Sequence, residues 1–237
     1  MTQRTPIWKA IASSIRHDIA EGIYGAGDKL PTEASLAQRF GVNRHTVRHA
    51  LAELAEENLI HARRGAGVFV TTTPTDYPIG RRVRFHQNLR AAGRSPAKKV
   101  LMLETRTAST AEADALRLTV GAQVHVYEGL SLAEGRPIAL FRSAFPATRC
   151  PDILEHLGEN PSVTSALAKC GVHDYIRAST RVNAKLATAT QALHLQIAEH
   201  APILRTIGIN VDFDGTPIEV GRTWFAGDKV TLTLSDE

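Results

Sequence analysis

The sequence predicts an α+β protein with two domains, and three observations lead to this prediction. Apolar residues recur at helical spacing up to about residue 57, whereas beyond residue 97 they follow the pattern of β-strands. Between these parts, residues 71–77 read TTTPTDY, the polar and proline-containing composition of a linker. We therefore expect a first domain over residues 1–72, a linker over 73–80 and a second domain over 81–237.

Length and composition fit a globular protein that can fold without disulfide bonds or structural metals. The 237 residues are 43% hydrophobic, enough to bury one large core or two modest ones. Cys150 and Cys170 have neither a redox spacing nor a metal-ligand spacing, so we expect reduced thiols, no metal and no cofactor. The first residues lack the order of a signal peptide, and no apolar run approaches membrane-spanning length. These features favour a cytoplasmic protein without a membrane partner.

The positive charge is unevenly distributed along the chain. Residues 1–72 carry nine Lys and Arg against seven Asp and Glu, residues 73–99 carry seven against one, and residues 100–237 carry twelve against sixteen. A basic N-terminal part followed by an acidic C-terminal part indicates that only the N-terminal part binds nucleic acid.

The first 40 residues predict two helices. Isoleucines recur every fourth residue from Ile7 to Ile19, which predicts an amphipathic helix over 8–21 that Gly22 can end. Thr32 can cap a second, short helix over 33–40, and Glu33 in its first turn suits the helix dipole.

A third helix is expected to begin after Asn43, a suitable N-cap, beyond a tight turn at Gly41. At helical spacing its apolar residues form one face and its basic residues the other. The apolar set is Val47, Ala50, Leu51, Leu54 and Leu59; the basic set is Arg44, His45, Arg48 and His49. Two arginines in the first turns of such a helix suit the guanine edges of a DNA major groove. Residues 59–70, LIHARRGAGVFV, then predict a β-hairpin with a basic, glycine-rich tip, which is a wing.

These residues carry a family resemblance. The stretch 30–70, with its motifs LPTE, LAQRFGVNRHTVR and RRGAGVFV, resembles the winged helix-turn-helix of the GntR superfamily of bacterial transcription regulators. The resemblance implies double-stranded operator DNA as partner. It places Arg44, Thr46, Arg48, Arg64 and Gly65 at the DNA, with Asn43, His45 and Arg63 beside them. One departure is Ala34, where such regulators often carry a basic residue that touches phosphate.

The second half predicts strands joined by hairpins, with helices between them. Strands are expected at 98–108, 123–133, 136–146, 175–186, 203–213 and 216–226, with turns at Glu134-Gly135 and Asp214-Gly215. Helices are expected near 85–93, from the capping box Ser109/Glu112 to 118, at 160–171 and at 188–195. Five or six strands with hairpin joins imply an antiparallel sheet.

This half resembles the effector-binding (UTRA) domain of the HutC subfamily, which shares the fold of chorismate lyase. Residues 76–96 and 179–195 look most like the phosphonate-utilisation repressors of the PhnF type. The resemblance implies a homodimeric repressor whose operator affinity is controlled by a small anionic effector, phosphonate or phosphate. A sugar phosphate or urocanate regulator of another pathway is the alternative.

The residues give no support to an enzyme. No serine lies in a nucleophile turn, no glycine-rich phosphate loop is present, and the ten histidines lack metal spacing. The alternative is a lyase-type enzyme fused to a DNA-binding domain, which the fold by itself does not exclude. The residues predict no catalytic site, and we expect the chain not to be an enzyme.

Arginines in the acidic second half are the candidate effector ligands. Arg142, Arg177, Arg181 and Arg222 lie in predicted strands, where an unpaired buried charge is costly and needs an anionic partner. Glu128 and Glu219 could supply it, or an oxyanion ligand could. Related HutC-type proteins carry two arginines where this chain has Gly129 and Ser131, so Arg84, Phe85 and His86 are expected to help hold the ligand.

Overall fold

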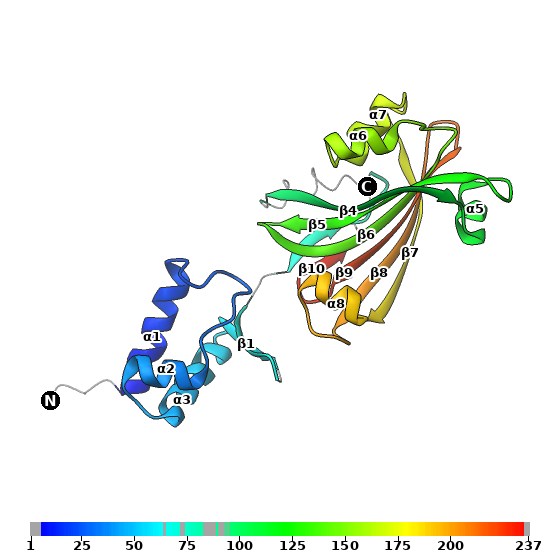
Figure 1. Cartoon of the computed structure of the whole chain (residues 1–237). Coiled ribbons are helices and arrows are strands. Elements are labelled where there is room, and N and C mark those ends of the chain that lie inside the picture. The colour runs from blue at the N-terminus through cyan, green and yellow to red at the C-terminus, as the bar shows by residue number, and fades with distance from the viewer. Residues whose placement is uncertain are drawn as a thin grey trace. The chain divides into compact units, whose positions relative to one another are not determined.

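Residues 6–63, 65–71, 74–82, 89, 93 and 95–234 are described by the computed structural model (Figure 1). The chain forms two compact units, Met1–Thr73 and Pro74–Glu237. None of the helices in the described ranges is long and apolar enough to cross a membrane.

The first unit consists of three helices and a hairpin: α1 (Ile7–Ala20), α2 (Glu33–Phe40), α3 (Arg44–Glu56), β1 (Ile60–Arg63) and β2 (Gly67–Val70). The apolar stripe of each helix turns inward, and Ile15, Val47 and Leu54 are fully buried together. Thr32 caps α2 by accepting a bond from the backbone N–H of Ser35. Gly41, with a positive φ of 63°, ends α2 and opens the turn into α3.

The second unit is built on one six-stranded sheet, in the order β4-β5-β6-β9-β8-β7, with every neighbouring pair antiparallel. These strands are β4 (Pro96–Thr107), β5 (Gln123–Ala133), β6 (Arg136–Pro146), β7 (Ile176–Leu186), β8 (Pro202–Val211) and β9 (Pro217–Ala226). The predicted α+β class with an antiparallel sheet is therefore confirmed.

Helices cover both faces of the sheet (Figure 1). They are α5 (Thr110–Leu116), α6 (Ile153–Glu159), α7 (Val163–Lys169) and α8 (Ala189–Leu195). On one face, α6 and α7 bury Leu157 and Leu167 against Tyr127 and Phe145 of the sheet. The opposite face carries two separate apolar clusters, one beneath α5 and one beneath α8. We call these two surfaces the α6/α7 face and the α5/α8 face.

A short parallel strand pair closes the second unit. β3 (Thr75–Pro78) pairs with β10 (Val230–Thr233), so the first and last strands of the unit lie side by side. Tyr77 of β3 is buried against Phe225 of the main sheet. Residues 75–78 fall within the stretch expected as a linker; the structure orders them as a strand because their alternate side chains are buried.

Turn and capping residues in the sequence correctly predicted the β5–β6 turn and the start of α5. Glu134 and Gly135 both have positive φ in the β5–β6 turn, and Ser109 with Glu112 forms the predicted capping box of α5. Helix α6 was not predicted: Asp152 at its N-cap makes no side-chain capping bond. The helix expected near 85–93 lies largely outside the described residues.

Candidate functional site

The exposed face of α3 presents the predicted DNA-reading residues. Asn43 caps the helix by accepting bonds from the backbone N–H and the hydroxyl of Thr46, at 2.8 and 3.0 Å. Arg44, His45 and Arg48 are exposed, while Val47 is fully buried. The amphipathic pattern thus directs the basic side chains outward, as the sequence predicted.

Glu33 holds Arg48 in place. The guanidinium of Arg48 donates to both carboxylate oxygens of Glu33, at 3.1 and 2.8 Å, across the helix-turn-helix. This ion pair lowers the pKa of Glu33 below its usual value. Sequence reasoning assigned Glu33 to the helix dipole and missed this second role, because spacing of 15 residues carries no local signal.

A shallow groove runs along the same face of α3. Trp8 of α1 stacks on His49, with ring centroids 4.1 Å apart and an interplanar angle of 18°. The groove is lined by Trp8, Asn43, His45, Thr46, Arg48, His49 and Ala52. Trp8 therefore belongs to this surface, although the sequence suggested only a place in the first helix.

The hairpin β1–β2 forms the predicted wing. Arg63 pairs in register with Gly67, and its guanidinium lies 4.8 Å from the ring centroid of Phe69 and donates to Nε2 of His61 at 3.1 Å. Gly65 has a positive φ of 75°, which suits glycine at the tip. Arg64, the other predicted contact, lies outside the described residues.

Lys29 is a wing residue that sequence reasoning missed. It forms an isolated bridge with Phe69, and its side chain passes directly over Gly67. A Cβ at position 67 would stand 2.7 Å from Cε of Lys29, so glycine leaves the space that the lysine occupies. Lys29 adds a positive charge beside the wing tip.

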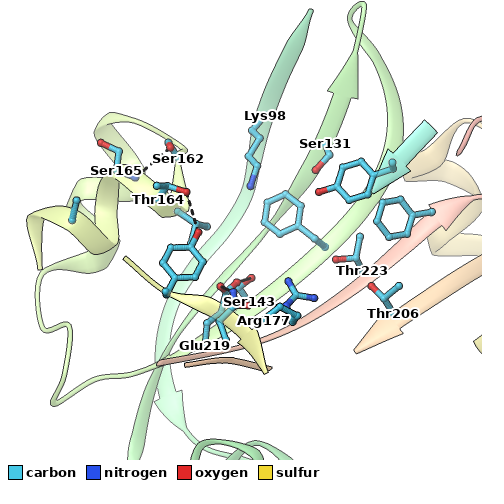
Figure 2. Close-up of a pocket in the computed structure, with 18 residues that line it drawn as sticks. Lys98, Ser131, Ser143, Ser162, Thr164, Ser165, Arg177, Thr206, Glu219 and Thr223 are labelled. Carbon is cyan, nitrogen blue, oxygen red and sulfur yellow. Dashed lines mark hydrogen bonds between the residues drawn. The ribbon is translucent and has the colours of Figure 1, made fainter. Parts of the chain in front are cut away.

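The second unit contains a cavity of about 420 Å³ on the α6/α7 face of the sheet (Figure 2). Its charged residues are Lys98, Arg177 and Glu219, from β4, β7 and β9. Hydroxyl groups supply most of the remaining polar lining: Tyr77, Ser131, Ser143, Ser162, Thr164, Ser165, Tyr175, Thr206 and Thr223. Such a lining can bind a small polar ligand with negative charge.

A hydrogen-bonded chain fixes the floor of the cavity. Glu219, 7% exposed, accepts bonds from the Ser143 hydroxyl at 2.5 Å and from the Asn210 amide at 2.6 Å. Asn210 in turn accepts a bond from Nε of Arg177 at 2.7 Å. The guanidinium of Arg177 lies against Gly208, where a Cβ would collide with it. Arg177 and Glu219 were both predicted as effector residues, and the structure brings them to one site.

Lys98 is a cation of the cavity that was not predicted from the sequence. It pairs in register with Ser131, one of the two positions where the family resemblance implied arginines in related proteins, and its ammonium lies 4.4 Å from the Phe141 ring centroid. Burial lowers the pKa of Lys98 to about 8, and the nearby Glu219 opposes this shift. At Gly129, the other position, a Cβ would stand 2.8 Å from Phe141, so the aromatic ring occupies that space.

The other predicted effector arginines do not share this site, which corrects the expectation of one arginine-lined pocket. Residues directly opposite each other in a sheet share a face. Arg142 lies opposite Arg222, and Ile207 lies between Arg222 and Arg181, so all three arginines share one face. Their neighbours Phe141, Ser143 and Gly221 line the cavity, so these three arginines point to the α5/α8 face. Arg84, Phe85 and His86 lie outside the described residues.

Comparison with known proteins supports both halves of this description. The profile of bacterial regulatory proteins of the gntR family matches residues 8–70, and the UTRA domain profile matches residues 91–231. An HTH-type transcriptional regulator of Rhizobium meliloti (strain 1021) is 38% identical over 96% of this chain and 94% of its own length. The probable transcriptional regulator PhnF of Escherichia coli (strain K12) is 30% identical over 96% of this chain and 94% of its own.

A solved structure agrees over nearly the whole chain. The crystal structure of PhnF from Mycobacterium smegmatis superposes with a TM-score of 0.67 at 26% identity, covering 96% of this chain and 99% of the other. These relatives are transcriptional regulators, and the prediction that the chain is not an enzyme is confirmed by them. The chain belongs to the GntR family of bacterial transcriptional regulators and is of the HutC type, with a UTRA domain after its DNA-binding domain.

Proposed function

We propose that this regulator is a repressor that binds a palindromic operator as a homodimer, and that a small oxyanion in the cavity controls its operator affinity. A phosphonate or phosphate is the effector class that we favour. The observation that carries this proposal is the cavity with Lys98 and Arg177 in its wall. Resemblance to the PhnF-type repressors supports the same class.

The charges favour a ligand with an anionic head and hydrogen-bonding oxygens. Lys98 offers an ammonium at one side of the cavity, and the Arg177–Asn210–Glu219 chain lines another part of it. The surrounding hydroxyls can donate to phosphonate oxygens. Glu219 is held by Ser143 and Asn210, so its charge opposes ligands with an anion at that end.

Calorimetric titration of the full chain tests the effector class. Phosphate, small phosphonates, a sugar phosphate and urocanate are each titrated with and without operator DNA. We expect phosphate or a phosphonate to bind and to change operator affinity by about 1–3 kcal/mol, with DNA changing ligand affinity by the same factor. If only urocanate or a neutral sugar binds, the oxyanion class is wrong while the regulator remains.

Lys98→Gln is the sharpest variant, and Lys99→Gln is its control. Lys99 is the next residue on β4, and its exposed side chain belongs to the other side of the strand. We expect Lys98→Gln to weaken anion binding at least tenfold and Lys99→Gln to leave it unchanged. In the unaltered chain, anion affinity should fall as the pH rises through about 8, because Lys98 loses its proton there. Equal affinities at pH 7 and pH 9 would remove Lys98 from the site.

A further inference from the structure

The α5/α8 face carries a row of charged residues between its two apolar clusters. Across the sheet the row reads Glu128, Arg142, Arg222, Ile207 and Arg181, each residue directly opposite the next. On one side of this row, Val220 and Ala144 belong to the apolar cluster beneath α5. On the other side, Leu140 and Trp224 belong to the cluster beneath α8. Charge therefore interrupts what would otherwise be continuous apolar surface.

This face is basic within an acidic domain. By strand register seven cations belong to it, against the carboxylates Glu104 and Glu128: Lys99, Arg106, Arg142, Arg181, Lys185, Arg205 and Arg222. Arg106 is neutralised by its ion pairs with Glu104 and Glu112. Residues 100–237 as a whole carry twelve Lys and Arg against sixteen Asp and Glu. Such segregation indicates a surface that is complementary to an anion.

The two central arginines are not both neutralised. Arg142 donates from Nε to Glu128 at 2.6 Å and makes a second ion-pair contact through Nη2. Arg222, half-buried and directly opposite Arg142, has no hydrogen-bond or ion-pair partner among the described residues. Like charges directly opposite each other in a sheet destabilise it. A bound anion would remove this repulsion.

The neighbouring row contains a second guanidinium with an N–H that is unpaired among the described residues. Nε of Arg205 is buried and lacks a hydrogen-bond partner within the described part of the chain, although another nitrogen of this guanidinium donates to Asn183 at 3.0 Å. A buried N–H without an acceptor is costly, so an acceptor supplied from outside would be favourable.

We propose that the row formed by Arg142, Arg181 and Arg222 is a second anion site, which binds a doubly charged oxyanion of the phosphate type. The guanidinium fork matches the tetrahedral oxygens of such an ion. The three arginines less the charge of Glu128 leave two positive charges, which balance a doubly charged anion. The site lies on the opposite face of the sheet from the cavity. It is thus distinct from the effector site proposed above and stands independently of it.

Trp224 gives a direct test with inorganic phosphate. It lies on the α5/α8 face, paired in register with Leu140 and Arg205, and Trp8 is the other tryptophan of the chain. In the full chain carrying Trp8→Phe, phosphate at constant ionic strength should shift the emission of Trp224 saturably. Arg222→Gln and Arg181→Gln should each weaken this response at least tenfold, whereas Arg149→Gln, an exposed arginine outside the row, should not.

The cavity variant separates this site from the effector site. Lys98→Gln should leave the Trp224 response intact even if it abolishes effector binding in calorimetry. A response that survives both Arg222→Gln and Arg181→Gln, or that Lys98→Gln abolishes, overturns the second site. The proposal is also overturned if the arginine variants change the oligomeric mass but leave phosphate binding unchanged, because the row would then bind another protein chain.

Discussion

The predicted DNA contact of Arg48 competes with its ion pair to Glu33. In the free chain both oxygens of Glu33 accept bonds from the guanidinium of Arg48, the group that would fork a guanine. Glu33 therefore fixes the orientation of Arg48 and repels phosphates that approach it. Both effects favour a matching base over the sugar-phosphate backbone.

We expect Arg48→Ala to weaken operator binding by roughly 1–3 kcal/mol. Glu33→Gln should instead raise the affinity for random DNA and lower the ratio of operator to random binding, because the guanidinium is less firmly held. Fluorescence anisotropy with both DNAs measures this ratio. Glu57→Gln is the matched control, since Glu57 pairs with Arg16 in the same domain. An unchanged ratio in Glu33→Gln would show that the carboxylate has no part in discrimination.

At the scale of single elements, α5 depends on one carboxylate. Glu112 accepts bonds from the guanidinium of Arg106 at 2.8 and 2.9 Å, and it completes the capping box with Ser109. The ion pair with Arg106, together with the bonds from Ser109, lowers the pKa of Glu112 to about 2. This seven-residue helix covers the apolar cluster around Leu116 and Val220.

The sign of the pH dependence follows from that shift. The contribution of Glu112 to stability is complete above its unfolded-state pKa near 4.5 and is lost progressively as the pH falls toward 2. We expect Glu112→Gln to cost roughly 2 kcal/mol at pH 7, from the lost cap and charged bonds. Urea unfolding followed by Trp224 fluorescence measures the difference, which should shrink at pH 3. A constant difference between pH 7 and pH 3 would contradict the ionic origin.

The wing should contribute charge rather than sequence discrimination. Lys29 over Gly67 and Arg63 on Phe69 present cations at the hairpin, where phosphates of a bound duplex would lie. We expect Lys29→Gln to weaken operator and random DNA equally and to reduce the slope of log affinity against log salt by about one. Arg149→Gln, in the other domain, should leave the slope unchanged. A selective loss for the operator would assign Lys29 a base contact instead.

Elements with local signals could be predicted from the sequence. The β5–β6 hairpin follows from the turn residues Glu134 and Gly135, and α3 follows from its cap at Asn43 and its apolar stripe. The β3–β10 pair could not be predicted, because a parallel contact between residues 75 and 230 leaves no trace in local sequence. Lys98 was missed for a similar reason: only the register opposite Ser131 reveals where it points.

A β-bulge in β7 explains why the faces of its arginines could not be predicted from the alternation of side chains along a strand. Arg177 and Arg181 are four residues apart on β7, so regular pleating would put them on one face. The register shift between Arg177 and Ser179 inserts a residue, and Arg177 then faces the cavity while Arg181 aligns with Arg222 on the other side. The four arginines were thus predicted as one site and are divided between the two faces of the sheet.

For the whole molecule, we expect the homodimer contact to lie in the second unit. The apolar faces of α1, α2 and α3 are consumed by their own small core, which leaves little for a partner. A fragment of residues 74–237, which keeps β3 paired with β10, should sediment as a dimer at micromolar concentration. A strictly monomeric fragment beside a dimeric full chain would place the contact in the first unit.

The β3–β10 pair determines how the second unit would respond to a pulling force. Tension between the DNA-binding domain and the C-terminus acts on β3 at Thr75 and on β10 beyond Thr233, which are opposite ends of two parallel strands. The load therefore runs along the strands, and the bonds of the pair must break together rather than one after another. Single-molecule stretching from these ends should give a higher unfolding force than pulling between Thr75 and Val230. Those two residues lie at the same end of the pair, so the hydrogen bonds would break one after another.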